Sequence, residues 1–170
     1  MKALVVYESM FGNTAQVAEA IAAGLRETMS VDVREVKDAP AVPADDIDVI
    51  VAGGPTHAFS MSRTRTRTDA IARGATHGEV DFGLREWING IPDERHSSSL
   101  VTFDTRVSKV RRLPGSAARS AAKAGRRHGF ASYASPESFY VDDMSGPLED
   151  GELERATAWG RELATLAAAR

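Results

Sequence analysis

Residues 2–14 of this chain read KALVVYESMFGNT, and they decide what the rest of the sequence can build. Lys2 to Tyr7 is a nearly continuous, valine-rich apolar run, which is typical of a strand covered on both faces. A polar loop containing Gly12 follows, and a helical pattern begins at about Asn13. The segment therefore predicts a buried parallel strand, a loop and a helix.

The loop at residues 9–14 has the features of a phosphate site. It lies between a strand and a helix, so backbone N–H groups and the positive end of the helix converge on one spot. Ser9, Asn13 and Thr14 add short side chains that can donate hydrogen bonds, and Gly12 permits a turn and close ligand approach. The loop has no lysine or arginine and no Gly-x-Gly-x-x-Gly spacing, which excludes a Walker A or dinucleotide motif.

The remaining chain alternates strand and helix patterns. Further strands are expected at residues 31–36, 47–52, 100–103 and 139–141. Helices are expected at residues 13–29, 68–75, 84–88, 114–128 and 150–167, the last capped by Asp150. This alternation predicts a parallel sheet with helices on both sides, in one domain over residues 1–170. Ligands bind beyond the carboxyl ends of such strands, at loops 8–13, 53–62 and 104–112.

Composition narrows the chemistry. The chain has no cysteine, so disulfides, thiolate metal sites, iron–sulfur ligation and catalytic thiols are excluded, and any redox chemistry must come from a bound cofactor. The four histidines show no metal-binding spacing, and we predict no metal site. The net charge of −3 does not indicate nucleic-acid binding. No run of eighteen apolar residues or signal peptide is found, and we expect a cytoplasmic protein without membrane insertion.

A longer segment carries a family resemblance. Residues 5–21, VVYESMFGNTAQVAEAI, resemble the FMN-phosphate signature of flavodoxins at every position that the signature restricts. The resemblance implies a flavodoxin-like doubly wound α/β fold, a five-stranded parallel sheet of strand order 2-1-3-4-5, with FMN bound non-covalently at its carboxyl end. The residues that it places at the phosphate are Ser9, Met10, Phe11, Gly12, Asn13 and Thr14. In the alternative interpretation, Ser9 and Thr14 only cap the helix.

The same resemblance implies that the flavin ring lies between the second and third loops. The residues that it places there are Pro55, Thr56, His57, Ala58 and Phe59, with Thr102, Phe103, Asp104, Thr105 and Arg106. Phe59 or His57 could stack on the ring. The tryptophan and tyrosine that many electron-carrying flavodoxins place in these loops are absent. The alternatives are a buried strand-end role for Phe103 and a plain loop histidine at position 57.

Positive charge follows both of these loops. Arg63 to Thr68 alternates arginine with threonine, and Arg106, Lys109, Arg111 and Arg112 follow the third loop. Such an edge either faces water or docks an anionic partner, which could be an acidic redox protein or the phosphates of a nicotinamide nucleotide. Electron-carrying flavodoxins are strongly acidic, whereas the acidic and basic residues of this chain are nearly balanced. The resemblance therefore favours enzyme-like branches such as quinone reductases and flavodoxin-like protoporphyrinogen oxidases.

The expected function is electron transfer through FMN. A donor, with NAD(P)H as a candidate, would reduce the flavin, and a redox protein or a small quinone-like molecule would reoxidise it. The flavin carries the chemistry, so no catalytic side chain is assigned. One alternative is a flavodoxin-fold binding or regulatory domain without flavin. Another is a response-regulator-like or small hydrolase domain, which would need an acidic cluster where the first strand offers only Glu8.

Overall fold

The architecture is a doubly wound α/β sheet. A computed structural model describes all 170 residues. Its parallel strands are β1 (Lys2–Tyr7), β2 (Ser30–Glu35), β3 (Val49–His57), β5 (Ser99–Val107) and β6 (Glu137–Val141). They lie in the order β2-β1-β3-β5-β6, which confirms the predicted order 2-1-3-4-5. The strand β4 (Ser60–Met61) pairs antiparallel with the end of β3 and was not predicted.

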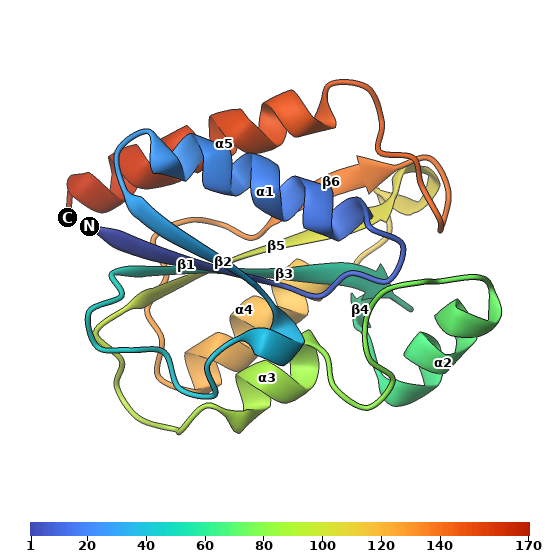
Figure 1. Ribbon diagram of the computed structural model, residues 1–170, viewed down its shortest axis with the longest axis horizontal. Helices are drawn as coiled ribbons and strands as arrows, with labels where there is room; N and C mark the ends of the chain where they lie inside the picture. Colours follow the sequence, from blue (N-terminus) through green and yellow to red (C-terminus); the bar gives the residue numbers. More distant parts are fainter.

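Helices cover both faces of this sheet (Figure 1). The α-helices are α1 (Asn13–Arg26), α2 (Thr64–Ala72), α3 (Leu84–Gly90), α4 (Ala117–Arg127) and α5 (Glu152–Ala168). Short 3₁₀ helices follow β2 and β5, at Val36–Asp38 and Ser108–Val110. α1 and α5 lie on one face, α3 and α4 on the other, and α2 lies beyond the carboxyl end of β3. None of the helices is both long and apolar enough to cross a bilayer.

The apolar run of β1 is explained by this double cover. Successive side chains of a strand point to opposite faces. Ala3 and Val5 therefore join the core beneath α1 and α5, whereas Leu4 and Val6 join the core beneath α3 and α4. A strand with one face in water would alternate apolar with polar residues, as β2 does at the edge of the sheet.

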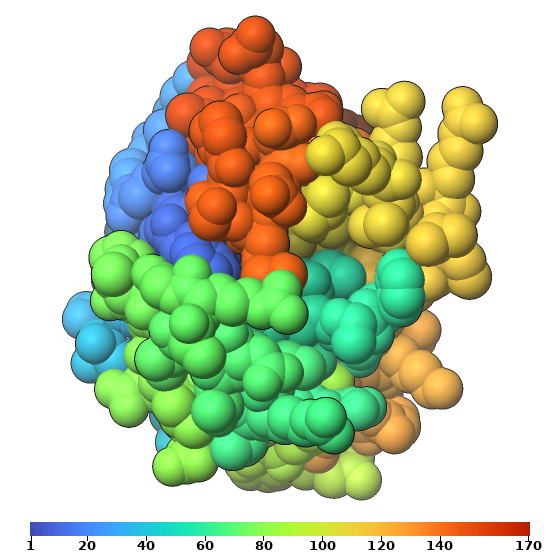
Figure 2. Space-filling model, turned by 90° about the vertical axis from the view of Figure 1, so that its right-hand side faces the viewer, coloured from blue at the N-terminus to red at the C-terminus, as the bar shows by residue number.

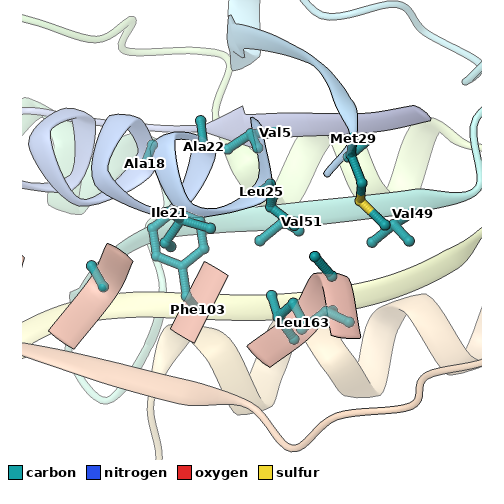
Figure 3. Packing of buried hydrophobic residues seen from close by; sticks show 14 of the residues in the cluster. Val5, Ala18, Ile21, Ala22, Leu25, Met29, Val49, Val51, Phe103 and Leu163 are labelled. Carbon is teal, nitrogen blue, oxygen red and sulfur yellow. The ribbon is translucent and has the colours of Figure 1, made fainter. Parts of the chain in front are cut away.

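Phe103 belongs to the first of these cores. Figure 3 shows its ring below Ile21 of α1. The side chain is fully buried and makes an edge-to-face contact with Phe139, with ring centroids 6.4 Å apart. The ring fits because Gly53 on the neighbouring strand has no side chain, and a Cβ there would lie 2.3 Å from it. The placement of Phe103 beside a flavin is therefore corrected to the buried strand-end alternative.

Three helix starts differ from the predictions, and one of them is α4, predicted from residue 114, which begins at Ala117 after its N-cap Ser116. The helix predicted at residues 68–75 is α2, which begins at Thr64, because the Thr66 hydroxyl accepts a hydrogen bond from the Arg63 amide and donates one to the Arg63 carbonyl. The arginine–threonine run that suggested a charged edge is thus the first part of a helix. At α5 the N-cap is Gly151 in a left-handed conformation, with φ of 84°, and Asp150 does not cap the helix.

Candidate functional site

A cleft of about 230 Å³ opens at the carboxyl end of the sheet. The first loop contributes Met10, Phe11, Asn13 and Thr14, and the second contributes Pro55, Thr56, His57 and Ala58. The remaining walls are Thr66, Asp69, Ala70 and Arg73 of α2, Thr105, Arg106 and Val107 of β5, and Val141 and Met144. Figure 2 shows this face of the molecule, where the blue start of α1, the green α2 region, the orange segment after β6 and the yellow segment after β5 meet.

The first loop forms a turn with unused donors. Gly12 has a left-handed backbone, with φ of 89°, and the Ser9 hydroxyl oxygen accepts hydrogen bonds from the amides of Gly12 and Ala15 at 3.1 and 3.3 Å. Four backbone amides in residues 10–14 donate no hydrogen bond within the protein. They are those of Met10, Phe11, Asn13 and Thr14. These four residues line the cleft at the positive end of α1, so the turn is suited to an anion.

Ser9 and Thr14 have different roles in this turn. Ser9 is buried and does not line the cleft, and its hydroxyl oxygen shapes the turn by accepting from two amides. The Thr14 hydroxyl does not cap α1 but lies 2.7 Å from the Thr105 hydroxyl at the end of β5. Because β3 lies between β1 and β5, this contact crosses the floor of the cleft. Capping therefore accounts for Ser9 but not for Thr14.

A segment that the sequence analysis did not single out closes one side of the cleft. The side-chain Nδ2 of Asn13 donates to the Ser145 carbonyl at 3.1 Å. A Cβ on Gly146 would lie 2.6 Å from the Asn13 carboxamide oxygen, so the segment can approach this closely only with glycine there. Met144 thereby enters the cleft wall, where its sulfur lies 3.6 Å from an Arg73 nitrogen.

The second loop is only partly in the cleft. Ala58 and Phe59 have φ of 48° and 62°, as in the turns that join two-residue hairpins, and here they connect β3 to β4. This turn directs Phe59 outward, where its side chain is exposed and does not line the cleft. Thr56 accepts a hydrogen bond from the Ala117 amide at 2.8 Å, which joins the loop to the start of α4. Of the two stacking candidates, only His57 lies in the cleft wall.

The tautomer of His57 follows from its contact with α2. Its Nδ1 lies 3.1 Å from the hydroxyl oxygen of Thr66. That hydroxyl already donates to the Arg63 carbonyl, so all of these contacts are satisfied when Nδ1 carries the proton and donates to Thr66. Burial, together with the positive charge of Arg67, lowers the pKa of His57 from 6.5 to about 4. The cleft therefore contains a neutral imidazole whose Nε2 is free to accept a hydrogen bond.

This pKa predicts how stability depends on pH. A histidine whose pKa is lowered by folding binds fewer protons in the folded state, so stability falls as pH drops from 6.5 towards about 4. We expect His57 to account for up to about 2 kcal/mol of lost stability between pH 6.5 and 5. Denaturant unfolding should show a smaller loss for His57→Gln than for the wild type. The variant of the exposed His77, His77→Gln, should retain the wild-type loss.

The third loop divides between the cleft and the interior. Thr105 and Arg106 line the cleft, whereas Thr102 and Asp104 are buried and do not. The Thr102 hydroxyl donates to the Ala118 carbonyl at 2.9 Å, and the Asp104 carboxylate accepts from the Ala118 amide at 2.8 Å. Burial raises the pKa of Asp104. Their placement beside a flavin is corrected, because both residues fasten α4 to the sheet.

Arg106 is a buried cation in the cleft wall. Its Nη2 donates to the carbonyls of Val110 and Leu113 at 2.8 and 3.2 Å, and its Nε has no partner. No carboxylate forms an ion pair with it, although the side chain is only 7% exposed. Burying an unpaired charge is costly, so an anionic ligand group would be stabilised here.

A second buried arginine holds α2 beside the first loop. Arg67 is fully buried, pairs with Glu86 at 3.0 Å and donates to the Ser62 hydroxyl at 2.8 Å. Ser62 in turn donates to the buried Glu8, which also accepts from the Leu84 amide at 2.8 Å. Burial raises the pKa of Glu8. Glu8 directly precedes the loop that contains Gly12. This network therefore ties α2, which forms one wall of the cleft, to the end of β1.

Comparison with known proteins agrees with this fold. The sequence model of a protein family described as a flavodoxin domain matches residues 4–67. Among solved structures, a flavodoxin from the domain Archaea superposes with a TM-score of 0.66 at 19% identity, covering 99% of both chains. Oxidised flavodoxin 1 from Bacillus cereus superposes with a TM-score of 0.69 at 20% identity, covering 97% of this chain and 98% of that one. At these identities the structures establish the fold.

A curated relative is more similar in sequence over a shorter span. The NAD(P)H dehydrogenase (quinone) of Caulobacter vibrioides, found in two strains, is 35% identical over 105 residues. The match covers 46% of this chain and 53% of that protein, so it spans about half the length of these relatives. The flavodoxin-domain match is confined to residues 4–67, and over the whole chain the shared feature is the flavodoxin-like fold.

Proposed function

We propose that this protein binds FMN non-covalently in the cleft and acts as a small flavin-dependent oxidoreductase. The observation that carries the proposal is the turn at Gly12, where four amides without protein partners line the cleft at the positive end of α1. A phosphate monoester has the charge and the acceptor oxygens to use these donors. The flavodoxin-like fold supports the same cofactor, because flavodoxins share both the sheet and this loop.

The other residues of the cleft fit the remainder of such a ligand. Met10, Phe11, Asn13 and Thr14 would hold the phosphate through their amides, with the Thr14 hydroxyl beside them. Pro55 to Ala58 and Thr105 to Arg106 would flank the ring, combining apolar surface with hydrogen-bonding groups. Bound FMN supplies the redox chemistry by accepting and releasing one or two electrons.

The neutral His57 and the buried Arg106 define what the wall can offer a ligand. His57 Nε2 accepts a hydrogen bond and, with the pKa of His57 at about 4, stays neutral at physiological pH. Arg106 provides fixed positive charge on the opposite, β5 side of the cleft. Such charge stabilises a reduced, anionic flavin relative to the oxidised form. This differs from the acidic surroundings of electron-carrying flavodoxins and favours an enzyme over a carrier.

We take NAD(P)H as the electron donor and a quinone as the acceptor. The name of the Caulobacter vibrioides relative, an NAD(P)H dehydrogenase (quinone), supports this choice. An acidic redox protein is the alternative partner, and it would use the basic segments near the cleft. Anaerobic mixing of the FMN-loaded protein with NADPH or NADH, followed by a benzoquinone, distinguishes the two, because only the proposed donor bleaches the flavin spectrum directly.

The phosphate role of the first loop is tested by comparing FMN with riboflavin. Thr14→Val should weaken FMN binding about tenfold to a hundredfold, because hydrogen bonds to a charged group contribute about 1.5–3 kcal/mol. Riboflavin, which lacks the phosphate, should bind the variant and the wild type similarly. Flavin fluorescence quenching in titrations of flavin-free protein measures both affinities.

A matched control comes from β5. Thr102→Val also removes a buried threonine hydroxyl, but that hydroxyl bonds to Ala118 and lies outside the cleft, so FMN affinity should not change. Equal losses of FMN and riboflavin in Thr14→Val would contradict the assigned role of the loop. A protein that stays colourless when FMN is added would instead favour a binding or regulatory domain without flavin.

A further inference from the structure

The loop after β5 carries positive charge that the protein leaves unpaired. Lys109, Arg111 and Arg112 are exposed and form no ion pair. With Ser108 and Glu149 they line a shallow hollow next to the cleft. Figure 2 shows long side chains of this yellow segment projecting from the body of the molecule. Because the whole chain has a net charge of −3, this concentration of cations is a local feature.

The backbone of this loop is held in place from below. Arg106 bonds to the carbonyls of Val110 and Leu113, and the Leu113 amide donates to the Val110 carbonyl at 3.0 Å. The exposed cations are therefore carried on a fixed turn. Arg106 itself lines the cleft, so positive charge continues from the exposed hollow to the buried wall. The charge of Arg106 is also left without an ion pair, although its side chain is only 7% exposed.

We propose that residues 106–112 form a binding site for the phosphate groups of a nicotinamide dinucleotide, separate from the phosphate turn at Gly12. A line of cations that leads into a cleft suits an elongated polyanion. Glu149 is the one carboxylate of the hollow, and it can accept hydrogen bonds from ribose hydroxyls, as acidic residues do in dinucleotide folds. Binding at this site is independent of flavin, but its role in electron donation rests on the proposed function.

The size of the hollow favours a small molecule over a protein. Five residues line it, whereas a specific protein interface buries about 800 Å² on each partner. Glu149 would also repel an acidic protein surface, and a nucleotide can turn its hydroxyls towards that carboxylate. A nucleotide bound here would extend towards the cleft, because Val107 lines the cleft and the next residue, Ser108, lines the hollow.

The probe for this site is ADP, which carries the adenosine and pyrophosphate of the dinucleotide. Calorimetric titration of the flavin-free protein should detect ADP binding, with adenosine at least about tenfold weaker. The triple variant Lys109→Ala/Arg111→Ala/Arg112→Ala should weaken ADP binding about tenfold or more. The control Arg126→Ala/Arg127→Ala removes two exposed cations at the far end of α4 and should retain the wild-type affinity.

The same variants distinguish ADP binding at residues 106–112 from ADP binding at the first loop. If Thr14→Val abolishes ADP binding while the triple variant retains it, the nucleotide occupies the turn at Gly12 and the proposal is overturned. Equal weakening in the control double variant would show unspecific charge attraction, which also overturns it. If FMN does not bind but ADP follows the expected pattern, the site at residues 106–112 is supported and the proposed flavin function is not.

Discussion

Arg67→Met should lower the free energy of unfolding by about 3–5 kcal/mol. Arg67 is fully buried, and its removal leaves Glu86 without its partner and the Ser62–Glu8 pair without its neighbouring cation. Methionine fills a similar volume, so the loss reports the missing charge and hydrogen bonds more than a cavity. Denaturant unfolding followed by circular dichroism measures the effect.

The neighbouring arginine of the same helix provides the control. Arg65 is exposed and forms no ion pair, so Arg65→Met should change stability by about 0.5 kcal/mol or less. Adding Glu8→Gln to Arg67→Met removes a buried carboxylate that the single variant leaves without a nearby cation. The double variant should therefore be more stable than Arg67→Met alone. Similar, small effects of Arg65→Met and Arg67→Met would contradict the buried network.

Gly160→Ala should destabilise the protein by about 3 kcal/mol, although alanine is the better helix former. A Cβ at position 160 would lie 2.2 Å from the Ile21 carbonyl oxygen, and one at Gly24 would lie 2.1 Å from the Thr157 carbonyl oxygen. Both obstacles are backbone atoms, so α1 and α5 must separate to make room. Thermal or denaturant unfolding of Gly160→Ala and Gly24→Ala should show the same loss.

Gly90→Ala tests whether this loss comes from helix packing. Gly90 is also helical, at the end of α3, but nothing lies within 4 Å of a Cβ built there. Alanine should therefore be neutral or stabilise the protein by up to about 1 kcal/mol, as intrinsic helix propensity predicts. If Gly160→Ala were as harmless as Gly90→Ala, the close approach of α1 and α5 would be disproved.

The sheet and the first loop could be predicted because their signals are local. The valine run of β1 and the Ser9 to Thr14 turn are contiguous in the chain, and the strand order followed from the family resemblance. The opposite wall of the cleft could not be found in this way. Asp69, Ala70 and Arg73 reach it only because α2 folds against the end of β1 through Arg67, a contact between distant segments.

Burial also overrides what residue type suggests. Arg67 stands in an arginine–threonine run that is expected to face water or dock an anionic partner, yet it is buried. Glu86 pairs with its charge, and Ser62 and the Val80 carbonyl accept hydrogen bonds from it. Phe103 was expected near a flavin, but the missing side chain of Gly53 opens a place for its ring in the core. Sequence patterns do not show that Arg67 meets Glu86 of α3, or that Phe103 meets Gly53 of β3. Each partner lies on another element of the fold.

The Thr14–Thr105 contact has a consequence for the energetics of ligand entry. It links the first turn of α1, which follows β1, to the end of β5, across the intervening strand β3. The spacing between the first and third loops is thus set by the protein itself before anything occupies the space between them. Preorganisation of this kind reduces the entropy that association must otherwise spend on ordering loops, so more of the contact free energy is retained as affinity.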